Sequence, residues 1–230
     1  MRTVLVLALS LGICVILARS TAGETPASST DAAVLERFLH PPGPRLKSYR
    51  ARRTLVASTM GGRMKAEVEA WTSVDANDTF RFEVIRESGS GLIIDRVLRE
   101  ALETEQRTHN QRDTGQAALT PENYDFQIQG RRDGGLVRIG LRPRRSSPML
   151  LNGAVTVRED GVVVRIDGNL SQAPSWWTER VEISRRYARV SGVQVPVEMS
   201  SRADVRVAGD STFLMTYHYA AVNGTPVAER

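Results

Sequence analysis

Tyr124-Asp-Phe126-Gln-Ile128 and Val137-Arg-Ile139-Gly-Leu141 open a long series of segments in which apolar residues alternate with polar or smaller ones. Alternation with a period of two turns every apolar side chain of a strand to the same face. Gly and Asp punctuate the gaps, as in Glu159-Asp-Gly161, which suits the short turns of β-hairpins. The range 123–224 is therefore predicted to form antiparallel strands, each half-buried.

The residues before this series are predicted to add three strands and two helices. Strands are expected over 46–60, 63–74 and 79–86. A short helix is expected near 31–39, ended by Pro41-Pro42. A second, amphipathic helix is expected over about 92–108, because its apolar residues follow helical spacing: Ile94, Val97, Leu98, Ala101 and Leu102. The polar residues 106–120, with His109 among them, are expected to form a loop.

About ten strands in one sheet would curl strongly under their natural twist. The predicted fold class is mainly β (α+β): a single large curled antiparallel sheet that forms an open half-barrel, with short helices covering its concave face. Such an arrangement encloses a wider apolar interior than a flat sandwich does.

The predicted organisation is a signal peptide, a linker, one domain and a tail. Arg2 precedes an apolar run from Val4 to Leu17, and small residues follow at Ser20-Thr21-Ala22, which is typical of a secretory signal over 1–22. An uncleaved membrane anchor is the alternative. Residues 23–30 have the composition of a polar linker, 31–224 form the domain, and 225–230 a C-terminal tail. Export across the inner membrane to the periplasm follows from the signal.

Composition excludes several classes of protein. Cys14 is the only cysteine and lies in the signal, so the mature chain offers neither disulfides nor cysteine metal ligands. The net charge of +5 falls to +3 once Arg2 and Arg19 are removed with the signal. The arginines alternate with acidic residues along the strands and are expected to be solvated, including the cluster Arg50, Arg52 and Arg53. Nucleic acid is not an expected partner.

The sequence contains no recognisable catalytic or metal-binding pattern. The three histidines, His40, His109 and His218, are far apart along the chain, and His218 is expected to point outward from its strand. Ser88-Gly-Ser90-Gly91 lacks the first glycine of a nucleophile elbow and is interpreted as a hinge. We therefore expect no enzyme activity, no catalytic residue, no metal and no cofactor.

The alternation brings methionines and aromatic residues to one face of the sheet. Two short helices can hardly fill so wide a cup, and methionines among aromatic residues suit an adaptable apolar site. Ordinary core packing is the simpler interpretation for each residue alone. As a set, the predicted ligand-binding residues of an apolar cavity are Met64, Val68, Phe80, Phe82, Leu98, Leu102, Phe126, Ile139, Val164, Ile166, Val181, Val197, Met199, Met215 and Tyr217.

The order of these elements resembles that of a known family. The motifs are Asn123-Tyr-Asp-Phe126, Pro143-Arg-Arg145, Leu151-Asn-Gly-Ala-Val-Thr-Val157, Val162-Val-Val-Arg-Ile-Asp-Gly168, Trp177-Thr-Glu-Arg-Val181, Gly192-Val-Gln-Val-Pro196 and Tyr217-His-Tyr219. Over residues 32–224 the chain resembles the LolA-like proteins that sort outer-membrane lipoproteins, whose fold is shared by LolB and the N-terminal domain of RseB.

The resemblance implies a monomeric periplasmic carrier that holds the acyl chains of a lipoprotein or another lipid in an apolar cavity, and that meets a delivery partner in the inner or outer membrane. It places Leu35, Phe38, Leu98 and Leu102 in a helical lid. Carriers of this family use an arginine near the lid, for which Arg50, Arg52 and Arg53 are all candidates. Two alternatives stay open: an envelope sensor with a packed core that binds a protein partner, and, third in order, an envelope hydrolase.

Overall fold

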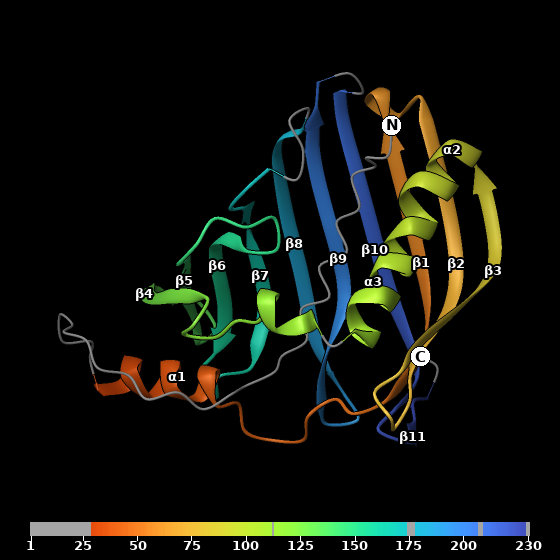
Figure 1. The fold of residues 1–230 in the computed structure, drawn as a ribbon. Coiled ribbons are helices and arrows are strands. Elements are labelled where there is room, and N and C mark those ends of the chain that lie inside the picture. Colours follow the sequence, from red (N-terminus) through yellow and green to blue (C-terminus); the bar gives the residue numbers. More distant parts are fainter. Residues whose placement is uncertain (1–28, 112, 174–177, 207–208, 229–230) are drawn as a thin grey trace.

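One curled antiparallel sheet dominates the computed structural model, which describes residues 29–228 except 112, 174–177 and 207–208. In the described residues the sheet has eleven strands in the order β3-β2-β1-β10-β9-β8-β7-β6-β5-β4, and β11 pairs with β10 (Figure 1). The end strands β3 and β4 are at opposite edges, so the sheet stays open. The predicted fold class, an open and mainly β half-barrel with short helices on one face, is confirmed.

The strands are longest in the middle of the sheet. Their bounds are β1 Tyr49–Thr59, β2 Met64–Val74, β3 Phe80–Gly89, β4 Tyr124–Arg132, β5 Leu136–Pro143, β6 Leu151–Arg158, β7 Val163–Leu170, β8 Thr178–Val190, β9 Val193–Val205, β10 Gly209–Val222 and β11 Thr225–Pro226. The last of these is a two-residue strand inside the range predicted as a tail.

Helical segments occupy the predicted places with different bounds. They are α1 Ser29–Leu39, η1 Met60–Gly62, α2 Gly91–Ile93, the π-helical η2 Ile94–Arg99, α3 Glu100–Asn110 and η3 Asp113–Ala117. Thus α1 begins inside the range predicted as a linker, 23–30. The signal range 1–22 lies outside the described residues. No described helix is both long and apolar enough to cross a membrane.

The predicted loop from residue 106 is wrong, because α3 continues to Asn110. The side chain of Asn110 accepts a hydrogen bond from the backbone N–H of Phe80 (2.9 Å) and donates one to its carbonyl oxygen (3.3 Å). His109 contacts Asp78 at 2.9 Å. These contacts with β3 and the turn before it hold the last helical turn, which its own polar sequence does not favour.

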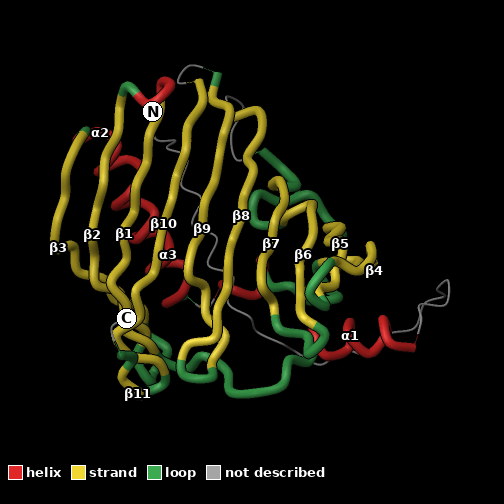
Figure 2. The backbone as a smooth tube through the Cα atoms, turned by 180° about the vertical axis from the view of Figure 1, so that it is seen from behind, coloured by secondary structure: helices red, strands yellow, loops and turns green. Residues whose placement is uncertain are grey.

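The helices cover one face of the sheet at two places. Segments α2, η2 and α3 run in front of β10, β1 and β2, while α1 lies at the opposite end, near β4 to β7 (Figure 1). Seen from behind, the strands β1, β2 and β10 lie in front of α2 and α3, while α1 projects beyond the sheet at the lower right (Figure 2). Val34 and Phe38 of α1 and Leu98 and Leu102 of η2 and α3 belong to one core cluster with the strands. Each such buried side chain contributes about 1.5–3 kcal/mol.

Gly89 makes the turn from β3 into α2 possible. Its φ is +96°, and a Cβ atom there would lie 2.3 Å from the carbonyl oxygen of Lys65 on β2. That oxygen accepts a hydrogen bond of 2.9 Å from the N–H of Ser90. Only glycine fits this approach without displacing β2. The position of the covering helix is therefore fixed at its start by the backbone.

A second, smaller core cluster lies where β8, β9 and β10 meet the segment that leads into β1. It contains Val193, Val195 and Val222, with Leu46, Val190, Val197, Tyr219 and Val227 packed against them. Asn223 joins this end together, since its side-chain oxygen accepts hydrogen bonds from the N–H groups of Lys47 (2.7 Å) and Ser48 (3.1 Å).

Candidate functional site

The helix-covered face of the sheet gathers most of the predicted cavity residues. Eight of the fifteen belong to the main buried cluster: Val68, Leu98, Leu102, Ile139, Ile166, Val181, Met199 and Met215. Four more are partly buried and pack against it: Met64, Phe82, Phe126 and Tyr217. Phe80 is also buried, with its ring 6.0 Å from that of His109. The alternation of the strands therefore identified one continuous apolar surface. Whether that surface binds a ligand stays a prediction.

Val164 and Val197 lie elsewhere, for a common reason. In the pairing of β6 with β7, Thr156 is opposite Arg165 and Val157 is opposite Val163, so Val164 has no partner across the pair. In the pairing of β8 with β9, Arg186 faces Glu198 and Tyr187 faces Pro196, which leaves Val197 as the extra residue. Val163 takes the core position in β7, and Val197 packs in the smaller cluster. A bulge breaks strict alternation, so a prediction from period two fails there.

The predicted lid residues occupy two separate covers. Leu98 of η2 and Leu102 of α3 are fully buried against the β1–β3 half of the sheet. Leu35 and Phe38 belong to α1, where Phe38 meets the ring of Phe126 edge-on at 5.6 Å. The resemblance implied one lid, whereas the structure has one helical cover at each end of the apolar surface.

Arg53 is the most deeply buried charged residue that the structure describes, with 1% of its surface exposed. Its two terminal nitrogens donate to both carboxylate oxygens of Glu105 in α3, at 2.5 and 3.1 Å. One of them also donates to the Tyr49 hydroxyl at 2.5 Å. The rings of Tyr217 and Phe80 lie 4.5 and 5.3 Å from the guanidinium carbon. A charge-assisted hydrogen bond thus joins α3 to β1.

Arg185 of β8 is a second buried arginine, 6% exposed, on the same face. It donates to the sulfur of Met199 at 3.4 Å and is hydrogen-bonded to Tyr187. Met199 lies directly opposite Met215 on β10, whose sulfur is 3.8 Å from the near nitrogen of Arg53. The two arginines therefore approach one pair of methionines from opposite sides. The prediction that the arginines are solvated is wrong for both.

Both arginines remain cationic in spite of their burial. Burial opposes the charged form of Arg53, but Glu105, Tyr217 and Tyr49 raise its pKa well above the ordinary value. Burial also opposes the charge of Arg185, while Tyr187, Tyr217 and Glu105 raise its pKa. Burial raises the pKa of the Tyr217 hydroxyl, which is therefore protonated at neutral pH. The interior keeps permanent charges among apolar side chains.

The other two arginines of the β1 cluster have different surroundings. Arg50 stacks its guanidinium over the ring of Trp71 at 4.5 Å, and Arg52 is exposed. Arg53 alone of the three reaches the covering helix. The sequence does indicate that Arg53 points inward, because it is two positions away from the apolar Ala51 and Leu55 and so lies on the same face of the strand. For the same reason Arg185 lies on the same face of its strand as Val181 and Ile183. A charged residue at an inward position is the pattern that was missed.

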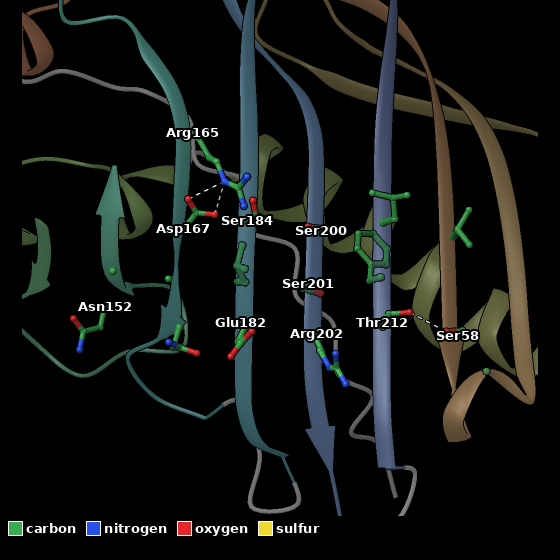
Figure 3. Close-up of a pocket in the computed structure, with 18 of the residues that line it drawn as sticks. Ser58, Asn152, Arg165, Asp167, Glu182, Ser184, Ser200, Ser201, Arg202 and Thr212 are labelled. Carbon is green, nitrogen blue, oxygen red and sulfur yellow. Dashed lines mark hydrogen bonds and ion pairs between the residues drawn. The ribbon is translucent and has the colours of Figure 1, made fainter. Parts of the chain in front are cut away.

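A groove of about 890 Å³ lies on the opposite face of the sheet (Figure 3). Its side chains alternate with core residues along the same strands and are mostly polar, among them Ser58, Glu182, Ser184, Arg202 and Thr212. Arg165 and Asp167 of β7 form an ion pair at 2.7 Å, and Ser58 of β1 is hydrogen-bonded to Thr212 of β10 at 2.8 Å. Polar side chains of this kind are typical of a solvated sheet face.

The histidines do not form a shared site. His40 contacts Glu36 at 3.0 Å, His109 contacts Asp78, and His218 is exposed on β10, as the alternation predicted. Among the residues that the structure describes, no three His, Cys, Asp or Glu side chains gather as metal ligands would.

The chain thus defines a class by its architecture: an open antiparallel half-barrel whose apolar face is covered by helices and contains two charged arginines. No protein-family model matches the chain, and no curated protein matches it. A crystal structure of a DUF1329 family protein from Desulfovibrio piger is similar over 82% of this chain and 90% of its own, with 10% sequence identity and a TM-score of 0.41. A likeness this distant says nothing about function.

Proposed function

We propose that the protein is a non-catalytic carrier that binds an acylated or lipidic ligand between the apolar face of its sheet and the helix α2–η2–α3. The observation that carries the proposal is the construction of this cover. It is a single helix that begins at a glycine-dependent turn and reaches a charged residue at the centre of the sheet, Arg53. A cover made of one helix can separate from the sheet with fewer broken contacts than a second packed sheet.

The surface beneath the cover suits an alkyl chain. Leu98 and Leu102 belong to the same buried cluster as Val68, Met199 and Met215. If an alkyl chain replaced the helix, each CH2 group that it buried would contribute about 0.8 kcal/mol of favourable free energy. Methionine side chains adjust their shape to different guests with little cost. The free energy lost when the helix separates can thus be recovered from the ligand.

A more specific version of this proposal is the role of the LolA-like proteins. In it the protein is a periplasmic monomer that receives a lipoprotein or lipid at one membrane and passes it to a partner at another. Arg53 and its contact with Glu105 match the lid arginine that the resemblance implies. Neither nucleic acid, a metal nor a cofactor has a part in this function.

The direct test is to lock the cover. Arg99 of η2 forms two hydrogen bonds with Glu87 of β3, at 2.7 and 2.8 Å. In a Cys14→Ser background, Arg99→Cys with Glu87→Cys, joined by a short bismaleimide, should abolish uptake of a fluorescent fatty-acid analogue. The matched control is Arg86→Cys with Glu67→Cys, another ion pair (2.9 Å) joined by the same reagent. This control links two paired strands and should bind normally.

The alternative is an envelope sensor whose core is filled by its own side chains. Close packing favours it, since Leu55, Val68, Leu98 and Leu102 are wholly buried. A sensor of this kind would take up no fatty-acid analogue, linked or unlinked, and native mass spectrometry after export would show it empty. Uptake by the protein with the locked cover would instead mean that ligands enter without movement of α3.

A further inference from the structure

The outer face of the sheet, which the helices do not cover, carries a tryptophan. In β2, Ala70 and Thr72 are buried on the inner face, and Trp71 lies between them on the outer face, partly exposed. The guanidinium carbon of Arg50 lies 4.5 Å from the centre of its ring. Tryptophan combines a large apolar ring with a polar N–H group, which suits a boundary between an apolar medium and water. Such a ring on a mostly polar face indicates where a partner would lie.

The two arginines of β1 beside Trp71 have no carboxylate of their own. Arg52 lies opposite Trp71 on β2 and opposite His218 on β10, and neither neighbour is acidic. In the part of the chain that the structure describes, Arg50 and Arg52 form no ion pair. By contrast, three arginines of β7, β8 and β9 on the same face each pair with a carboxylate. The charges of Arg50 and Arg52 are therefore available to another molecule.

The segment that leads into β1 adds two more cations. Arg45 and Lys47 are exposed, and their side chains have no ion-pair partner among the described residues. Asn223 holds this segment in place, since its side chain accepts a hydrogen bond from the N–H of Lys47 (2.7 Å) and donates one to the carbonyl oxygen of Arg45 (2.8 Å). Glu83 of β3, opposite Trp71, also has no ion pair within the described residues. It offsets one of the four positive charges, so this region has a net positive charge.

We propose that this region is a docking surface for a bilayer that contains anionic phospholipids. We call it the basic outer patch, and it consists of Arg45, Lys47, Arg50, Arg52 and Trp71. The outer face of β1 and β2, on which the last three residues lie, is turned to the viewer in Figure 2. The inference goes beyond the carrier function, because binding to a bilayer does not depend on what the interior holds.

The arrangement of the charges favours a surface over a single anion. The four cations are spread along the chain from residue 45 to residue 52 and do not converge on one point. A bilayer presents many separate negative headgroups, and each Lys or Arg near it is stabilised by the surface potential. Trp71 adds a ring of the kind that is enriched at the headgroup level of membranes. The basic outer patch thus matches an anionic bilayer in both charge and polarity.

Sedimentation with phospholipid vesicles tests the proposal on the exported protein. One preparation contains only phosphatidylcholine, and the other contains three parts phosphatidylcholine to one part phosphatidylglycerol, which is anionic. At about 0.1 M salt, where charges are screened over about 10 Å, the protein should bind the anionic vesicles at least about tenfold more tightly. About 1 M salt should abolish this binding. Similar affinity for both preparations, or for the anionic one at both salt concentrations, would overturn the proposal.

Two arginines that differ in pairing provide matched variants of equal net charge. Arg52→Gln should weaken binding to the anionic vesicles about fivefold, which corresponds to about 1 kcal/mol. Arg186→Gln removes the same charge from β8, where Arg186 pairs with Glu198 at 3.2 Å, and should weaken binding less than about twofold. Glu83→Gln removes a negative charge beside Trp71 and should strengthen binding, an effect that a folding defect cannot imitate.

The remaining outcomes decide against the patch or for it. Equal losses in Arg52→Gln and Arg186→Gln would mean that net charge alone attracts the vesicles, which overturns the patch. Unchanged binding in folded Trp71→Ala would remove Trp71 from it. Failure to sediment with either preparation would overturn the bilayer as the partner and leave an acidic protein surface as the other candidate. Vesicle binding by a protein that takes up no fatty-acid analogue would leave the patch standing without the carrier function.

Discussion

The two faces of the sheet use arginine in opposite ways. On the outer face, Arg165, Arg186 and Arg202 are exposed and each pairs with a nearby carboxylate. On the inner face, Arg53 and Arg185 are buried among aromatic rings and methionines. Adjacent positions of one strand, 185 and 186, thus place the same side chain in two dielectric environments. The comparison shows that burial, and not residue type, decides how strongly an arginine interacts with the groups around it.

Exposed pairs contribute little because water and salt screen them. Measured values for such pairs are mostly below about 1 kcal/mol. In the interior the same charges interact more strongly, and removing one partner leaves the other without compensation. The ion pairs of the outer face therefore contribute little each, while those of the inner face contribute more. Substitutions matched across the two faces test this difference.

The largest difference is expected at Val155 and Thr156 of β6. Val155 is wholly buried between Ile139 and Ile166, so Val155→Asp buries a charge with no partner and should cost about 4 kcal/mol or more. Thr156 lies opposite Arg138 and Arg165, so Thr156→Asp should change stability by less than about 1 kcal/mol. Urea unfolding measures both. Similar losses at the two positions would contradict the assignment of the faces.

The second difference concerns Glu105 and Glu198, which each pair with one arginine. Glu105→Ala leaves Arg53 buried without its carboxylate and should cost about 3–5 kcal/mol in ligand-free protein. Glu198→Ala, on the outer face, should cost less than about 1 kcal/mol, and 1 M salt should abolish even that. The check is urea unfolding at low and high salt. A loss at Glu105 that salt removes would mean that the Arg53 contact is open to solvent.

The smallest effect at neutral pH comes from the tyrosines of the inner face. Burial is the largest cause that raises the pKa of Tyr49, Tyr124, Tyr217 and Tyr219. Their unfolded pKa is about 10. Above that pH the unfolded chain releases protons that the folded protein still holds, so the free energy of unfolding falls as pH rises. Below about pH 9 these groups should leave stability unchanged.

Absorbance at 295 nm, recorded together with circular dichroism, checks this expectation. Phenolate should form together with the loss of sheet signal. Ionisation of all tyrosines near pH 10 in a protein that keeps its sheet would mean that these rings are accessible to water.

Much of this architecture followed from the sequence. Strict alternation in β4 and β5 and helical spacing around Leu98 fixed the class of fold and the apolar face. Val164 and Val197 were misplaced because bulges are set by pairing with a neighbouring strand, which a single strand does not reveal. The last turn of α3 was missed because Asn110 is held by β3 and not by helix propensity.

The charged centre was missed for a different reason. Most arginines in proteins are exposed to solvent, and Arg52 and Arg186 are exposed here as well. Arg53 and Arg185 depart from this rule because both alternate with core residues of their own strands. Their meeting point also depends on the strand order, which brings β1 next to β10. A list of inward positions along each strand finds the two residues, but only the strand order shows that they converge.

The same strand order has a kinetic consequence. Arg53 lies opposite Tyr217, so β1 is completed on that side only by a strand that is far away along the chain. Closing so long a loop lowers the entropy of the chain before any stabilising contact has formed. Sheets with such distant pairings therefore fold slowly. Hairpins such as β4–β5 and β6–β7 can form early from local contacts. The arginine-containing centre is then among the last parts to assemble, and a chain that has not yet paired β1 with β10 leaves the inner edge of β1 open to other strands.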